Sequence, residues 1–224
     1  MSDLHADRSK TVIIDTNQMD WQASPAPGVW RKRLELIGDT EKGMVTSVVR
    51  FDPGCGFPEH DHPFGEEVLV LDGVFADEFG EYPAGTMTLL PTGTRHRPWT
   101  ENGCTLFVKL CQYAGTDRPT RRIDTSDPAG WRPTWAGREV FDLFDEPGHA
   151  ERIYLSRLAP GAEAPHHTHE GGEEVFVVSG ELADENGRYR AGTWMRLPDG
   201  SSHRPRSDGG CLLYVKTGHL GRGA

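Results

Sequence analysis

The stretch FDPGCGFPEHDHPFGEEVLVLDG at residues 51–73 decides the fold, because it recurs as LAPGAEAPHHTHEGGEEVFVVSG at residues 158–180. The match continues without a gap to residues 109 and 216, and 30 of the 59 aligned positions are identical. The identical residues are of mixed type, so a shared compositional bias does not explain them. A chain of 224 residues is long enough for two domains of roughly 100 residues each. The sequence therefore predicts a tandem duplication of one small domain.

Each copy has the pattern of a small β-domain. The runs EEVLVL and EEVFVV have the composition of strands and end at Gly73 and Gly180. Turn residues recur about every 8–12 positions, which is typical of sandwiches and barrels. The chain holds 27 Gly and 16 Pro, a composition that suits many short strands better than long helices. We predict an all-β fold of two tandem barrel domains.

The domain boundaries are placed where the repeat ends. Residues 31–113 and 138–219 are predicted to form the domains, with a linker at 114–137, an N-terminal arm at 1–30 and a tail at 220–224. Within the arm, TVIID at 11–15 is a candidate extra strand. It either pairs with a neighbouring sheet edge or frays.

Charge and cysteine content argue against several classes of protein. Acidic residues outnumber basic ones by 34 − 24 = 10, so we expect neither nucleic acid nor a membrane as a partner. The N-terminus MSDLHADRSK is polar, and no apolar run approaches the roughly 20 residues that span a bilayer. We therefore expect a soluble, cytoplasmic protein. The four cysteines form no CxxC pair, which argues against a redox dithiol or a zinc knuckle.

Four potential metal ligands stand at the same offsets in both copies. His60 and His62 are two residues apart, so on a strand both imidazoles lie on one face. Glu66 follows after a short bend, and His96 comes 30 residues after Glu66. Three imidazoles and a carboxylate suit a divalent first-row metal. We predict two metal sites per chain, with the ligands His60, His62, Glu66, His96, His167, His169, Glu173 and His203.

Other polar residues near these sets receive lesser roles. Strand alternation turns Glu67 and Glu174 away from the histidines, and we expect three further histidines to be idle, namely His5, His149 and His219. Residues shared by both copies are expected to be scaffold, namely Tyr82, Tyr189, Arg97 and Arg204. Where the copies differ, Trp194 and Arg196 replace Met87 and Leu89. If these positions line the barrel, Arg196 gives the second pocket a cation that can hold a carboxylate or a carbonyl.

The same residues match the two motifs of the cupin superfamily, so each copy resembles a cupin, a jelly-roll β-barrel. The first motif is Gly, five residues, His-x-His, three or four residues, Glu, six residues, Gly. It is met by Gly54, His60, His62, Glu66 and Gly73, and by Gly161, His167, His169, Glu173 and Gly180. The second motif is met by Gly85, Pro91, Gly93 and His96, and by Gly192, Pro198, Gly200 and His203, with Thr100 and Ser207 in place of its final Asn.

The second copy, from HTHEGGEEVF at residue 167 onward, resembles more closely the C-terminal cupin domain of the ChrR anti-sigma factor family. This resemblance implies zinc on the four matching residues of each copy and a regulatory or ligand-sensing role. The family also carries an N-terminal helical domain whose His-x3-Cys-x2-Cys zinc site grips the sigma factor. This sequence contains no such motif, so we expect no sigma-binding domain in it.

The identity of the metal separates functions that the ligand set leaves open. Four protein ligands close a tetrahedral zinc, whereas on an octahedral iron, manganese or nickel they leave two positions for substrate. The first hypothesis is a regulatory or ligand-sensing protein, and the second is a metal-dependent dioxygenase acting on a small ketone or diketone. The third, an isomerase or sugar-acid binder, lacks an obvious general base. The expected partners are a small-molecule ligand and a second copy of the chain in a homodimer, because one face of each central strand needs a cover.

Overall fold

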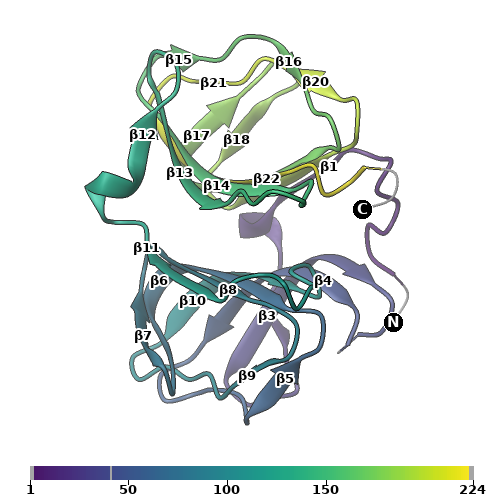
Figure 1. The fold of residues 1–224 in the computed structure, drawn as a ribbon, viewed down its shortest axis with the longest axis vertical. Helices are drawn as coiled ribbons and strands as arrows, with labels where there is room; N and C mark the ends of the chain where they lie inside the picture. The colour runs from purple at the N-terminus through teal and green to yellow at the C-terminus, as the bar shows by residue number, and fades with distance from the viewer. Residues whose placement is uncertain (1–2, 41, 222–224) are drawn as a thin grey trace. The chain divides into compact units, whose positions relative to one another are not determined.

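The computed structural model describes residues 3–40 and 42–221 and divides the chain into two β-units (Figure 1). Unit 1 comprises Met1–Ala6 and Met19–Ser126, and unit 2 comprises Asp7–Gln18 and Asp127–Ala224. Helical structure in the described residues is confined to two short 3-10 turns, η1 (Thr16–Gln18) and η2 (Pro128–Gly130). The predicted all-β fold is confirmed. Within the described residues, no helix is both long and apolar enough to cross a membrane.

Unit 1 is built on one antiparallel sheet with a small second ladder. The order of the main sheet is β11 (Arg121–Asp124), β8 (Thr86–Leu90), β6 (Glu66–Asp77), β10 (Cys104–Leu110), β4 (Met44–Phe51), β3 (Val29–Ile37) and β2 (Gln22–Ala23). Strand β7 (Gly80–Pro83) forms a hairpin with the far half of β6. The small ladder pairs β5 (His60–His62) with β9 (Thr94–His96).

Unit 2 repeats this arrangement. The order of its main sheet is β1 (Val12–Asp15), β19 (Thr193–Leu197), β17 (Glu173–Ala183), β22 (Cys211–Thr217), β14 (Arg152–Leu158), β13 (Arg138–Phe144) and β12 (Trp131–Pro133). Three short strands extend the sheet, namely β15 (Ala162–Glu163), β18 (Arg188–Arg190) and β21 (Arg206–Ser207). The small ladder pairs β16 (His167–Thr168) with β20 (Ser202–His203).

Alternate residues of the central strands fill the interior of each unit. In unit 1 the buried cluster includes Val68, Val70, Leu106 and Val108, and in unit 2 it includes Val175, Val177, Leu213 and Val215. Both copies carry a β-bulge at the same place, where Leu71 and Val178 are the extra residues opposite β10 and β22. A bulge bends its strand and increases the local twist, so the duplicated sequence reproduces the curvature of the sheet as well as its core.

The edge strands of the two main sheets come from outside the repeated sequence. In unit 1 the strand beside β8 is β11, which lies in the segment predicted as a linker. In unit 2 the corresponding strand beside β19 is β1, which lies in the N-terminal arm. The hydroxyl of Thr16 anchors β1 by donating to the carbonyl oxygen of Gly192 at 2.7 Å. The TVIID segment therefore pairs with a sheet edge. Of the predicted tail, residues 222–224 lie outside the described residues.

Substitution of Gly180 tests why the central apolar run of each copy ends at a glycine. Its φ is +74°, and an added Cβ would collide with the carbonyl oxygen of Gly210, which directly precedes the neighbouring strand β22. Gly200 is the matched control, since its φ is +78° and a Cβ there would meet no atom within 4 Å. Gly200→Ala should cost about 1 kcal/mol from its φ alone. Gly180→Ala should cost a further ~1–3 kcal/mol from overpacking.

Urea unfolding of the full chain, followed by tryptophan fluorescence, measures both costs. Equal losses for the two variants would show that the close approach of Gly210 does not constrain Gly180.

Candidate metal centres

The small ladders bring the histidines of each copy to one point. In unit 1, His60 on β5 is the direct cross-strand partner of His96 on β9. His62 lies two residues along β5, so it shares a face with His60. Directly opposed residues have their Cβ atoms about 5 Å apart, a separation that allows two imidazoles to converge. Unit 2 repeats the pairing with His167 opposite His203.

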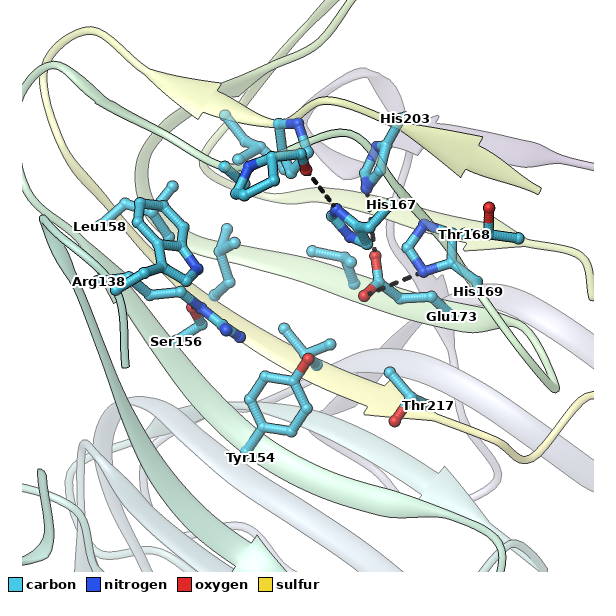
Figure 2. Close-up of a pocket in the computed structure, with 18 of the residues that line it drawn as sticks. Arg138, Tyr154, Ser156, Leu158, His167, Thr168, His169, Glu173, His203 and Thr217 are labelled. Carbon is cyan, nitrogen blue, oxygen red and sulfur yellow. Dashed lines mark hydrogen bonds and ion pairs between the residues drawn. The ribbon is translucent and has the colours of Figure 1, made fainter. Parts of the chain in front are cut away.

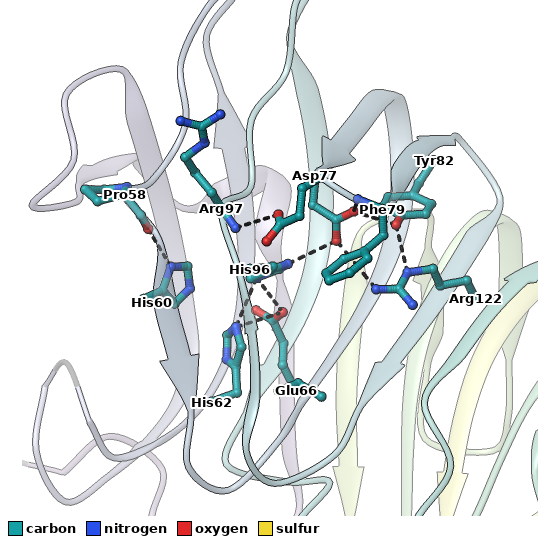
Figure 3. A network of polar contacts seen from close by, with 12 residues as sticks. Pro58, His60, His62, Glu66, Asp77, Phe79, Tyr82, His96, Arg97 and Arg122 are labelled. Atoms are coloured by element: carbon teal, nitrogen blue, oxygen red, sulfur yellow. Dashed lines mark hydrogen bonds and ion pairs between the residues drawn. The ribbon is translucent and has the colours of Figure 1, made fainter.

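The fourth donor arrives from the main sheet. Glu66 is the first residue of β6 and Glu173 the first residue of β17. In unit 1 the Oε2 atom of Glu66 lies 3.5 Å from Nε2 of His62 and 3.6 Å from Nε2 of His96 (Figure 3). The structure therefore brings together all four residues that the sequence predicts as ligands in this unit.

In unit 2 the same convergence occurs with a different ring orientation. Glu173 lies 3.5 Å from Nδ1 of His169 and 3.7 Å from Nε2 of His203, through its two carboxylate oxygens (Figure 2). In each unit the three histidines offer ligand atoms that all lie within 4.8 Å of one another. His62, His96, His169 and His203 are buried, whereas His167 is exposed and His60 is partly exposed.

The donor sets fit a divalent metal on grounds of hydrogen bonding as well as spacing. Among the described residues, three buried atoms of these sets have no hydrogen-bond partner, namely Oε2 of Glu66, Nε2 of His169 and Nε2 of His203. Buried polar atoms without partners are costly, and a cation shared by the donors would satisfy Oε2 of Glu66 and Nε2 of His203. Binding of metal by these residues stays a prediction.

The atoms that face away from each centre are held by the protein. Nδ1 of His60 lies 2.8 Å from the carbonyl oxygen of Pro58, and Nδ1 of His167 lies 2.9 Å from that of Pro165. A carbonyl can only accept, so Nδ1 carries the proton and Nε2 keeps its lone pair for the centre. Local backbone thus selects the tautomer of the first histidine in each copy.

A buried aspartate holds the last histidine of each set. Nδ1 of His96 lies 3.3 Å from Oδ2 of Asp77, and Nδ1 of His203 lies 3.1 Å from Oδ2 of Asp184. Each aspartate accepts a second hydrogen bond from a tyrosine hydroxyl, Tyr82 at 2.6 Å and Tyr189 at 2.8 Å. Such outer contacts orient a ligating imidazole and raise its basicity. The tyrosines, expected as scaffold, therefore act on the site through the aspartates.

These two aspartates are not among the residues predicted from the sequence, although a signal was present. Asp77 and Asp184 occupy the same place in the repeated FADE and LADE segments, and the identity was as informative as that of the histidines. Arg97 and Arg204 contribute backbone rather than side chain, since their N–H groups donate to Glu78 and Glu185. Their side chains are exposed.

Burial and hydrogen bonds shift the pKa values of several donor residues. Burial lowers the pKa of His169 to about 3 and also lowers the pKa of His62. For His96, burial lowers the pKa, but the hydrogen bond to Asp77 and the charge of Glu66 outweigh it and the pKa rises. Burial raises the pKa of Glu173 to about 8, and the charge of Arg138 opposes the rise. The Glu173 carboxyl is therefore protonated at neutral pH, and it would gain a cation as its partner when metal binds.

A cavity of about 380 Å³ opens beside the donors of unit 2. Besides His167, His169, Glu173 and His203, polar residues in its lining include Arg138, Tyr154, Ser156 and Thr217 (Figure 2). The corresponding cavity of unit 1 is about 200 Å³ and contains His60 and Glu66. Its remaining lining is mostly apolar and includes Val49, Phe51, Phe57, Val68 and Leu106, together with Arg31.

The interpretation of Arg196 as a pocket cation is wrong. Met195 belongs to the interior cluster of unit 2, so its neighbours Trp194 and Arg196 point to the opposite face of β19. Arg196 is fully buried there and donates to the carbonyl oxygen of Asp7 at 2.8 Å. Arg138 on β13 is the cation that lines the cavity of unit 2, and it lies outside the gap-free repeat.

Glu174 turns away from the metal ligands, as strand alternation predicted. Its two carboxylate oxygens face Nε1 of Trp194 at 2.8 Å and Nε2 of His219 at 3.2 Å. The expectation that His219 is idle is therefore wrong, because this histidine contacts a buried carboxylate.

Comparison with known proteins agrees with the duplicated architecture. The family model of the ChrR Cupin-like domain matches residues 9–114 and again residues 120–221. No curated protein matches the chain. At the identities found, the likeness to solved structures shows the fold.

Three of these structures illustrate the likeness. A candidate dioxygenase of Nostoc punctiforme has a TM-score of 0.74 and 18% identity over 96% of this chain and 85% of that chain. A pirin of Escherichia coli in complex with nickel(II) has a TM-score of 0.70 and 13% identity over 93% and 98%. Oxalate decarboxylase of Bacillus subtilis has a TM-score of 0.62 and 14% identity over 92% and 76%.

Proton release tests the state of Glu173. With a pKa of about 8, this carboxyl is protonated at pH 7, whereas His169, with a pKa of about 3, is already neutral. Metal must displace the carboxyl proton. In a His60→Ala background, which disables unit 1, zinc should release close to one proton per chain at pH 7 from Glu173. The number should fall as the pH rises above 8.

Calorimetric titration in buffers of different ionisation enthalpy measures this number. Glu173→Gln in the same background should lose that proton and bind zinc more weakly. Zinc binding without proton release in the parent at pH 7 would contradict the protonated state of Glu173.

Proposed function

Because the chain belongs to the ChrR cupin-like family, we propose that it binds a divalent first-row metal in each unit and recognises a small ligand at the centre of unit 2. The family model matches most of the chain in two copies, and each copy carries one donor set. The role proposed for the chain is regulatory or ligand-sensing.

The cavity beside the unit 2 donors is the observation that carries this proposal. A structural zinc site is closed by its four protein ligands, whereas here His167, His169 and Glu173 line a space of about 380 Å³. That volume is at the small end of ligand sites, which range over roughly 300–1,000 Å³. A partly polar cavity next to metal donors supports ligand binding over a purely structural role.

The chain's own residues would prepare this space in distinct ways. His167, His169, Glu173 and His203 would hold the cation, which when bound supplies an electrophile that polarises a ligand oxygen. Asp184 orients His203, and Leu158, Val175 and Leu213 supply apolar walls. Zinc is the metal expected first from the family resemblance. Iron, manganese and nickel accept the same donors.

Metal content tests the two-centre part of the proposal. Elemental analysis of the parent should give two metals per chain, one for each His-rich group. His60→Ala and His167→Ala should each retain about half of that content, because losing one of few ligands severely weakens a site. His166→Ala is the matched control, since this exposed neighbour of His167 lies outside the group.

Full metal content in either ligand variant would remove that unit's donor set from the proposal. A parent without metal after incubation with zinc, iron(II) and nickel(II) would remove both.

A metal-dependent dioxygenase is the second candidate function, favoured by the same cavity. Four donors on an octahedral iron leave two positions open, and a space of about 380 Å³ beside them can hold a small ketone or diketone. The solved structures with the same fold include a candidate dioxygenase, which at 18% identity supports the fold more than the activity.

Oxygen uptake separates the two candidates. Protein loaded anaerobically with iron(II) and mixed with 2,4-pentanedione or a hydroxyaryl ketone is placed in an oxygen electrode. Under the sensing proposal, oxygen should be consumed no faster than by His167→Ala. Turnover that depends on both His167 and the added ketone would replace the sensing role with the enzymatic one.

A further inference from the structure

The two cavities have the same metal donors but different walls, and the strand register shows where they diverge. In unit 1, Val29 on β3 pairs with Phe51 on β4. In unit 2, Arg138 on β13 pairs with Leu158 on β14. Phe51 and Leu158 are equivalent in the repeat, so Arg138 occupies the position that Val29 holds in unit 1. An inward-facing aliphatic side chain has been exchanged for a guanidinium.

Neighbouring positions have changed in the same direction. Ser156 stands where unit 1 has Val49, and Thr217 stands where unit 1 has Leu110. Tyr154 replaces Ser47, which keeps a hydroxyl and adds an aromatic ring. These changes concentrate hydrogen-bonding groups around Arg138, whereas the unit 1 cavity stays largely apolar.

Arg138 is held in place yet has no anionic partner in the described part of the chain. Its Nε donates to Oγ of Ser156 at 2.9 Å, and its guanidinium carbon lies 5.5 Å from the centre of the Tyr154 ring. Among residues 3–40 and 42–221 no carboxylate lies within ion-pair distance of it. This contrasts with Arg132, Arg152 and Arg157, which pair with Asp142, Asp145 and Glu139. Figure 2 shows the side chain of Arg138 extending into the cavity from the side away from His169.

We propose that unit 2 takes a small carboxylic acid with a second oxygen function, such as a 2-oxo or 2-hydroxy acid, whose carboxylate pairs with Arg138. The inference rests on the proposed function, because the second oxygen is directed to the centre formed by His167, His169, Glu173 and His203. Guanidinium matches a carboxylate through two parallel N–H donors, and a planar, pre-positioned fork loses little entropy on binding. In unit 1 the equivalent residue, Val29, is packed in the core, and a different residue of the same strand, Arg31, lines the cavity.

Pyruvate and pyruvamide provide a matched pair of probes. They have the same number of heavy atoms and the same 2-oxo group, and they differ in that one carries a carboxylate and the other a neutral amide. Zinc-loaded protein in the His60→Ala background presents the unit 2 centre alone. Calorimetric titration should show pyruvate binding about ten-fold or more tightly than pyruvamide, the difference typical of a charge-assisted bidentate pair.

Arg138→Gln should bring the two affinities to within about two-fold of each other, since a neutral amide cannot favour a carboxylate. Arg31→Gln, the control on the unit 1 cavity, should leave the preference for pyruvate unchanged. Zinc content is measured on every variant. Parent protein that takes up none of zinc, iron(II) and nickel(II) overturns the proposed function itself.

Protein that holds zinc but binds pyruvate no more tightly than pyruvamide, or binds neither, overturns the carboxylate assignment alone. This parent comparison needs no variant and stands even if Arg138→Gln fails to fold. Retention of the full preference in zinc-loaded Arg138→Gln would likewise overturn it.

Discussion

The cross-strand pairing of His60 with His96, and of His167 with His203, is the contact on which each centre depends. Three imidazoles can surround one point only if two of them face each other and the third comes from the same face of one strand. The small ladders meet this requirement with very few residues. The rest of each unit then serves to place one carboxylate, Glu66 or Glu173, at the start of the neighbouring central strand.

Around this shared centre the two copies differ in their outer contacts. In unit 1 the Nε of Arg122 on β11 donates to the hydroxyl of Tyr82 at 2.7 Å, which extends the chain from His96 through Asp77. In unit 2 the register places Ile13 of β1 at the position of Arg122, because these residues lie opposite Met195 and Thr88, which are equivalent in the repeat. At this register position the edge strand therefore carries a cation in unit 1 and an aliphatic side chain in unit 2.

Inside the barrels, too, the two units share the donor residues and differ in the residues around them. The donor residues are identical in type, while the walls have moved toward polarity in unit 2 and remained apolar in unit 1. After duplication, a donor cannot change without loss of the site, whereas a wall residue can change while the core stays packed. This difference in tolerance explains how the two cavities can differ in their walls while the donor residues stay the same.

The sequence by itself determined the duplication, the all-β fold and the family, and it predicted the residues that converge at each centre. These features depend on local spacing. Such signals include an i, i+2 pair on a strand, a glycine at a close backbone approach and a repeated motif. Each can be interpreted without knowing the tertiary contacts of the domain. The inclusion of β1 in the sheet of unit 2 was left open between pairing and fraying, because an edge strand of four residues carries little pattern of its own.

Only the tertiary structure decided which residues line the cavities. The inward face of β19 could not be assigned from its sequence, since both faces carry apolar residues, and Arg196 was a pocket cation only on the condition that it faces inward, which the structure contradicts. Arg138 could not be identified because its strand lies before the aligned block, where the repeat offset sets it against Arg31 whereas the strand register sets it against Val29. Asp77 and Asp184 were repeated but unassigned, since a carboxylate nineteen residues from a histidine acts on it only after the β6–β7 and β17–β18 hairpins bring the two together.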